Sequence, residues 1–346
     1  MERVRKLNMS SRFIPCLVLF LIISLFGCAP REPQSTEQKS SEAPSKLRIA
    51  VIPKGTTHEY WKTIHAGAIK AGKELGVEII WKGPQKEDDR EQQIQVVQNF
   101  TTSNVSGIVL APLDAKALVN PVREATQAGI PVVIIDSGLE AEVGKDYISY
   151  VATDNYQGGV LSARRLAEKM GGTGKAILLR YQEGSASTEL REAGFLDTLK
   201  KEFPNIQVVS DNQHAGPTTE SGMQAAQRLL SQFPDIQGFY CPNESSTFGT
   251  LRALEVDGRA GKIAFVGFDS SEKLVQGMRE GKIHGLALQN PLKMSYLGVK
   301  TLVSHLHGEK VEEKIDTGVV MVTPENMDQP DIKEVLLPDL SQYLSE

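Results

Sequence analysis

The stretch Ile130-Pro131-Val132-Val133-Ile134-Ile135-Asp136-Ser137-Gly138 is an apolar run that ends abruptly at a carboxylate. The same pattern, an apolar run followed by Asp-Ser, occurs again in Ile263-Ala264-Phe265-Val266-Gly267-Phe268-Asp269-Ser270-Ser271. A continuous run of Val, Ile and Phe between turn signals is typical of a central parallel strand that is covered on both faces. Asp136 and Asp269 would then follow the carboxyl ends of two strands, where open α/β sheets bind their ligands. We therefore expect two facing sheets, each offering one Asp to a small molecule held between them.

The rest of the chain alternates short apolar runs with amphipathic helical patterns, which predicts α/β architecture with parallel sheets and right-handed crossovers. We expect strands at 47–52, 77–81, 108–111, 176–179, 206–209 and 238–241. We expect helices at 61–75, 88–100, 115–128, 154–170, 188–203, 219–233, 247–256 and 294–307. Gly76 is the expected residue just beyond the first helix.

Two similar halves predict two domains joined by a three-segment hinge. The chain should cross between them near 151–154, 288–291 and 314–317. The predicted N-terminal lobe combines 47–152 with 290–315, and the C-terminal lobe combines 153–289 with 316–346. The last stretch contains several prolines and no helical or strand period, so we expect it to pack as coil on the second domain.

The first residues have the composition of a secretion signal, with basic residues before an apolar run from Phe13 to Phe26. Leu25-Phe26-Gly27-Cys28 resembles the lipobox of bacterial lipoproteins, in which the Cys is lipidated and becomes the first mature residue. We predict a signal peptide at 1–27 and a flexible tether at 28–46. An ordinary signal peptide with a chance Cys, and an ordered N-terminal arm, are the alternatives.

Length and charge fit a soluble two-domain protein without a nucleic-acid partner. The 346 residues carry a net charge of −5, and removal of residues 1–27, which carry +3, leaves −8. Basic residues are scattered among acids, whereas nucleic-acid binding needs a basic patch or stripe. After loss of Cys16 with the signal and lipidation of Cys28, Cys241 would remain alone, so we expect no disulfide.

None of the candidate motifs for catalysis, metals or cofactors has the residues and spacing that such a site requires. The run Gly171-Gly172-Thr173-Gly174-Lys175 lacks residues that a phosphate loop requires and precedes a strand instead of following one. His305 and His307 point to different faces of a helix and do not form a metal site. We therefore expect no catalytic residues, no metal and no cofactor, although a triad assembled in space stays open.

Five motifs along residues 47–323 together resemble the ribose- and galactose-type periplasmic sugar-binding proteins, the receptor subunits of bacterial ABC importers. They are Asp136-Ser137, Arg191 in Leu190-Arg191-Glu192-Ala193-Gly194-Phe195, Asn243 in Cys241-Pro242-Asn243-Glu244, Gly267-Phe268-Asp269, and Gln289 in Leu288-Gln289-Asn290-Pro291. The resemblance implies a type I periplasmic binding protein fold, with two Rossmann-like domains that close on ligand. It also implies a monomer that binds a monosaccharide or polyol and docks an ABC permease, and the lipobox-like residues add an anchor to the cell envelope at Cys28.

The resemblance further implies a set of ligand-binding residues: His58, Tyr60, Trp61, Asp136, Ser137, Arg191, Asn243, Phe268, Asp269 and Gln289. In this family the paired aromatics, here Tyr60 and Trp61, stack on the apolar face of a sugar, while charged and amide groups bond its hydroxyls. Ser137 stands where ribose-type members carry Arg, and His58 stands where they carry Asn, so we do not expect the ligand to be bound as ribose is.

Alternatives remain for several of these residues and for the function. Trp61 could pack inward, either Asp could cap a following helix, and Asn243 could belong only to a turn. A sensory receptor for chemotaxis or a histidine kinase would have the same pocket. An extracytoplasmic sugar-acting enzyme would use Asp136 and Asp269 as its carboxylate pair, but neither lies in an evident pKa-raising context.

Overall fold

The computed structural model describes residues 46–344. The predicted signal peptide and the lipidation site at Cys28 lie outside the described residues, as does all but the end of the predicted tether. None of the helices within 46–344 combines the length and apolar character that crossing a membrane requires. The described chain contains two six-stranded sheets, so the prediction of two α/β domains is confirmed.

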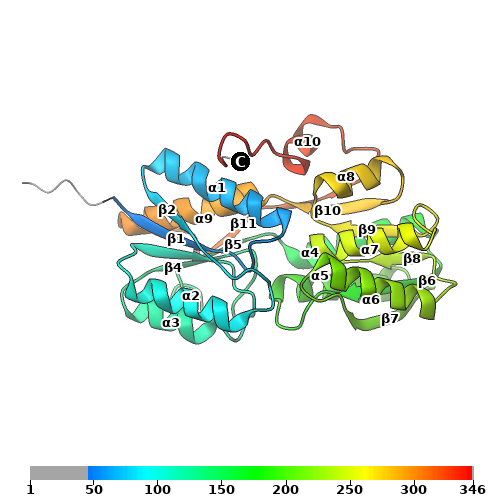
Figure 1. Ribbon diagram of the computed structural model, residues 1–346, viewed down its shortest axis with the longest axis horizontal. Coiled ribbons are helices and arrows are strands. Elements are labelled where there is room, and N and C mark those ends of the chain that lie inside the picture. The colour runs from blue at the N-terminus through cyan, green and yellow to red at the C-terminus, as the bar shows by residue number, and fades with distance from the viewer. Residues whose placement is uncertain (1–45, 345–346) are drawn as a thin grey trace, which may run out of the picture. The chain divides into compact units, whose positions relative to one another are not determined.

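The first sheet is wholly parallel, in the order β11-β5-β4-β3-β1-β2. Its strands are β1 (Arg48–Ile52), β2 (Glu78–Trp81), β3 (Gly107–Leu110), β4 (Val132–Ile135), β5 (Ser149–Ala152) and β11 (Lys314–Asp316). Its helices are α1 (Glu59–Leu75), α2 (Arg90–Thr102), α3 (Val119–Gln127) and α9 (Pro291–Leu306). In Figure 1, α9 lies beside α1 although more than 200 residues separate them in sequence.

The second sheet has the order β12-β10-β9-β8-β6-β7, and only the β10–β12 pair is antiparallel. Its strands are β6 (Gly174–Arg180), β7 (Ile206–His214), β8 (Gly238–Tyr240), β9 (Ala264–Phe268), β10 (Gly285–Gln289) and β12 (Val319–Val322). Its helices are α4 (Asn155–Lys169), α5 (Ala186–Glu202), α6 (Thr219–Gln232), α7 (Glu244–Val256), α8 (Glu272–Arg279) and α10 (Pro330–Leu336).

Both faces of each sheet are covered, which explains why the strands read as continuous apolar runs. Along β1, Ile49 and Val51 pack with α1 and α9, whereas Ala50 and Ile52 pack with α2 and α3. In the second sheet, α4 and α5 cover one face, and α6, α7, α8 and α10 cover the other. Each helix layer therefore fixes one side of a strand and leaves its carboxyl end free to carry a polar residue.

The chain crosses between the sheets three times, as the sequence predicts, and the crossings meet in one hydrogen-bond network. The hydroxyl of Thr153, just after β5, donates to Oε1 of Gln289 at the end of β10, 3.0 Å away. It also lies 3.3 Å from the hydroxyl of Thr317, which links β11 to β12. The lobe boundaries given above stay a prediction, but these three residues define the hinge.

The C-terminal stretch corrects the expectation of coil on the second domain. Residues 330–336 form α10, and Ile332 and Leu336 join the core of the second lobe. The chain then continues to the first lobe, where the backbone carbonyl of Gln342 accepts a hydrogen bond from Lys73 of α1. Figure 1 shows this red segment passing from α10 towards α1. The prolines concealed a short helix because Pro330 stands at its first turn, where proline is tolerated.

Candidate functional site

Asp136 and Asp269 occupy equivalent places in the two sheets, one residue beyond β4 and β9. Their φ angles are 64° and 65°, and no other non-glycine residue within 46–344 has a positive φ. The left-handed region disfavours most side chains and is tolerated best by Asp and Asn among them. Neither residue is the N-cap of a helix, since α8 is capped by Ser271 and β5 is the element that follows Asp136. Helix capping therefore does not explain either Asp.

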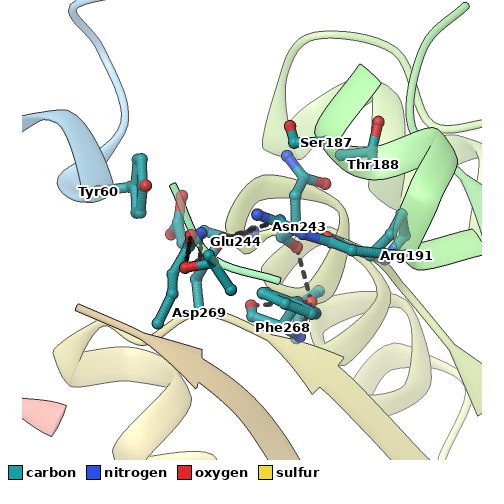
Figure 2. Close-up of polar contacts among 12 residues, drawn as sticks. Tyr60, Ser187, Thr188, Arg191, Asn243, Glu244, Phe268 and Asp269 are labelled. Atoms are coloured by element: carbon teal, nitrogen blue, oxygen red, sulfur yellow. Dashed lines mark hydrogen bonds and ion pairs between the residues drawn. The ribbon is translucent and has the colours of Figure 1, made fainter. Parts of the chain in front are cut away.

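The two carboxylates are brought together at one cavity between the lobes, with about 320 Å³ of space between the atoms, part of it open to solvent. Eight of the ten predicted ligand-binding residues line it: His58, Tyr60, Trp61, Asp136, Arg191, Asn243, Asp269 and Gln289. Figure 2 shows Tyr60 of α1 on the left, Arg191 and Asn243 of the second lobe on the right, and Asp269 below and between them.

Asp136 is held by two groups of the first lobe. The hydroxyl of Tyr60 donates to Oδ1 of Asp136 over 2.8 Å, and Lys54 Nζ lies 3.2 Å from Oδ2. Burial raises the pKa of Tyr60 well above its ordinary value, and the negative charges of Asp136 and Asp269 raise it further. Tyr60 therefore stays a neutral hydroxyl that fixes the orientation of Asp136.

Asp269 is held by the second lobe and the hinge. The amide of Gln289 donates to Oδ1 of Asp269 over 2.7 Å, the backbone N–H of Glu244 donates to Oδ2, and Arg191 lies 3.9 Å from Oδ2. Burial raises the pKa of Asp269, the charge of Arg191 and the bond from Gln289 lower it, and the charge of Asp136 raises it; the net shift is upward. The expectation that neither Asp lies in a pKa-raising context is thus wrong for Asp269, because its burial is not visible in sequence.

Arg191 is fixed on three sides and is 2% exposed. Its Nε donates to Asn155, one amino group donates to the carbonyl of Pro242, and the guanidinium lies 3.8 Å from the ring centroid of Phe268. Phe268 is not among the cavity-lining residues and instead supports Arg191 from behind (Figure 2). Such stacking restricts the guanidinium to one plane facing Asp269.

Ser137, like Phe268, is not among the residues that line the cavity. Its hydroxyl accepts a hydrogen bond from the backbone N–H of Ser187, in α5 of the other lobe. Lys54 spans the same gap and contacts the hydroxyls of Ser185 and Ser187 at 3.2 and 3.0 Å. The lobes are therefore in contact at the cleft edge as well as at the hinge, which is a closed arrangement.

Tyr60 and Trp61 line the cavity and also belong to the core of the first lobe. Trp61 is 2% exposed, belongs to the first-lobe core and donates its indole N–H to Glu87 over 2.8 Å. The rings of Tyr60 and Trp61 meet edge to face, with centroids 5.0 Å apart. Asn243 likewise has a structural role, because its side chain accepts from the backbone N–H of Ser246 and caps α7. Stacking by the aromatics and ligand contact by Asn243 stay predictions.

A family model described as a periplasmic binding protein domain matches residues 49–310. The chain belongs to the periplasmic binding protein family. A carbohydrate transporter solute binding protein from Agrobacterium radiobacter, solved in complex with D-arabinose, is 35% identical with a TM-score of 0.82, covering 85% of this chain and all of that one. A solute binding protein from Agrobacterium vitis with bound D-fucose is 36% identical with a TM-score of 0.81, covering 84% and 100%. The D-ribose/D-allose-binding protein of Pseudomonas aeruginosa is 29% identical over 88% of this chain and 97% of its own length.

This periplasmic binding protein has cavity residues that were not predicted: Lys54, Glu87, Tyr181, Ser187, Thr188 and Glu244. Lys54 and Tyr181 follow the carboxyl ends of β1 and β6, so the rule that identified the aspartates could have found them. In both sheets these strands lie where the strand order reverses. Glu87 stands in a charged run that reads as solvated surface, so the sequence held no signal for its burial.

Glu87 forms a buried ion pair with His58 in this periplasmic binding protein. His58 Nδ1 lies 2.6 Å from Glu87, and His58 Nε2 lies 3.0 Å from the carbonyl oxygen of Pro217 in the other lobe. Burial lowers the pKa of His58, but the charge of Glu87 and its hydrogen bond outweigh burial and raise the pKa from 6.5 to about 9. Burial raises the pKa of Glu87, whereas His58 and Lys54 lower it to about 2. The pair is therefore charged at neutral pH.

This pair predicts a pH dependence of stability. A histidine whose pKa is higher in the folded state stabilises fully below 6.5 and loses that contribution as pH rises through about 9. We expect the free energy of unfolding of the wild type to fall by an amount on the order of 2–3 kcal/mol across this window, and the decline to shrink in His58→Gln. Urea unfolding at a series of pH values measures it. His305→Gln, at an exposed histidine, is the control, and equal declines in wild type and His58→Gln would contradict the prediction.

Proposed function

We propose that this periplasmic binding protein captures a monosaccharide or related polyol in the cavity between its lobes and delivers it to an ABC importer. The observation that carries the proposal is the pair of left-handed aspartates, one from each sheet, that line one cavity between the lobes. A sugar presents hydroxyls around its rim, and carboxylates accept hydrogen bonds from two neighbouring hydroxyls at once. The relatives solved with D-arabinose and D-fucose support this ligand class.

Ligand capture would act through the balance of open and closed lobes. A ligand can drive closure only by binding the closed state more tightly than the open one. Here the cavity takes groups from both lobes, and contacts from Lys54 and Ser137 to Ser187 join the lobes at the cleft edge. A sugar that touches Asp136 and Asp269 together would gain its full set of contacts only in the closed arrangement.

The family indicates an extracytoplasmic location and a binding role, and we propose that the mature chain is anchored by lipid at Cys28 and acts as a monomer. The basic and apolar residues before Leu25-Phe26-Gly27-Cys28 support cleavage before the Cys. Two or more acyl chains give stable membrane association, whereas one chain binds only marginally. Replacing Cys28 with Ser should move the protein from the membrane fraction to the soluble one; unchanged fractionation would oppose the anchor.

A thermal-unfolding screen against pentoses, hexoses and polyols tests the proposed function. A ligand at 100 times its dissociation constant should stabilise the protein by about 2.7 kcal/mol and raise the midpoint of unfolding. The proposal fails if no sugar or polyol shifts the midpoint. Turnover of glycosides by the purified protein would instead favour an enzyme.

A further inference from the structure

The cavity contains more carboxylates than cations, and the excess carboxylate is Glu244. The cations are Lys54, His58 and Arg191, and the carboxylates are Glu87, Asp136, Glu244 and Asp269. Lys54 pairs with Asp136, His58 pairs with Glu87, and Arg191 faces Asp269. Within residues 46–344, the Glu244 side chain forms neither an ion pair nor a hydrogen bond. With every other group charged, an ionised Glu244 leaves the cavity one negative charge in excess.

Glu244 is nevertheless buried, since the residue is only 7% exposed at the first turn of α7. Figure 2 places it between Tyr60 on one side and Asn243 on the other, at the centre of the site. A buried polar group without a partner is costly, and a buried charge without a counter-ion more so. Other carboxylates of native interiors are paired, as the three other acids of this cavity are. Glu244 lines the cavity, so its carboxylate is available to pair with a group of a bound ligand.

The charges around Glu244 indicate which kind of ligand group suits it. Burial raises the pKa of Glu244 to about 7, the charge of His58 lowers it, and the charges of Asp269, Glu59 and Glu87 raise it. A protonated amine would neutralise the excess charge and donate a charge-assisted hydrogen bond. A neutral hydroxyl would leave the charge uncompensated, so the carboxyl would hold its proton instead. The acidic surroundings thus favour a cationic group over a neutral one at this position.

We propose that Glu244 is a specificity-determining residue that binds a protonated amine, so that the preferred ligand is an amino-substituted monosaccharide or polyol. The inference rests on the proposed function and narrows its ligand class. Asp136 and Asp269 would bond the hydroxyls that an amino sugar shares with its parent, while Glu244 would bond the ammonium that replaces one of them. Discrimination would come from charge pairing, because the two ligands have nearly the same size and shape.

Calorimetric titration with matched ligand pairs tests this inference. The probes are pentoses and hexoses, each compared near neutral pH with amino-deoxy analogues in which one hydroxyl is replaced by an amine. Every titration contains EDTA, so that bound metal ions do not affect the measured affinities. We expect at least one analogue to bind wild-type protein about tenfold or more tightly than its parent sugar. In Glu244→Gln, which keeps the side-chain shape and removes the charge, that preference should fall to about twofold or less.

A matched variant separates direct contact from a long-range charge effect. Glu59→Gln removes an exposed carboxylate near Glu244 that does not line the cavity, so the amine preference should persist. Sugar binding by the wild type without preference for any amino analogue overturns the inference and leaves the proposed function standing. A preference that survives in Glu244→Gln also overturns it. Absence of binding by every parent sugar and every analogue rejects the proposed function and the inference together.

Discussion

Asp136→Asn and Asp269→Asn should each weaken monosaccharide binding by at least about tenfold, because a hydrogen bond to a charged group contributes about 1.5–3 kcal/mol. Asn suits the test because it tolerates the left-handed backbone of these two positions. Ala would add strain at the same φ and mix a folding defect with a binding defect. The loss at position 136 should be the larger, because Lys54 Nζ lies 3.2 Å from the Asp136 carboxylate, whereas Arg191 lies 3.9 Å from that of Asp269.

Isothermal calorimetry with the sugar identified by the thermal screen measures this loss, and thermal unfolding checks that each variant is folded. Asp154→Asn is the matched control. Asp154 is exposed and caps α4 by accepting from the backbone N–H of Gln157, a role that Asn performs equally well. Wild-type affinity in both Asp136→Asn and Asp269→Asn would show that the cavity described here is not the sugar site.

Gly159→Ala should destabilise the second lobe by about 1–3 kcal/mol or more, because it overpacks the contact between α4 and α5. A methyl group at Gly159 would overlap the backbone carbonyl of Arg191, and one at Gly194 would overlap that of Tyr156. The two helices therefore approach with backbone against backbone, and glycine alone fits at both places. Because Arg191 belongs to the overlapped turn, sugar affinity should fall together with stability.

Urea unfolding and calorimetry measure both effects. Gly222→Ala, in the interior of α6, is the control, since its methyl group would meet Ser246 at an ordinary 3.4 Å. Ala is favoured over Gly in a helix interior, so this variant should be as stable as wild type or up to about 1 kcal/mol more stable. Equal stabilities of Gly159→Ala and wild type would mean that α4 and α5 are not packed this closely.

The paired aspartates could be predicted from sequence because the signal is local: an apolar run, a carboxylate, and a second copy of the same arrangement. The parallel sheets followed from the alternation of strands and helices. Lys54 obeys the same rule at the end of β1 and was missed, because Pro53-Lys54-Gly55 reads as a surface turn. Its role depends on Asp136 and Ser187, which are distant in sequence and become neighbours only through folding.

The sequence also did not show which side chains are buried or which residues they contact. Glu244 stands next to Asn243, yet nothing local distinguishes a solvated glutamate at a helix start from one enclosed by two lobes. Phe268 was predicted as a ligand-binding residue from the motif Gly267-Phe268-Asp269, whereas the structure places its ring against Arg191. Such assignments depend on which face of an element meets which neighbour, and that is a property of tertiary structure.

Gln289 connects the hinge to the cavity. Its amide oxygen accepts from Thr153 at the pivot, while its amide nitrogen donates to the Asp269 carboxylate in the cavity. A guest that competes for that carboxylate must change the bonding of the side chain on which the lobes turn. Ligand contact and hinge bonding therefore share one side chain, so a substitution of Gln289 should change both.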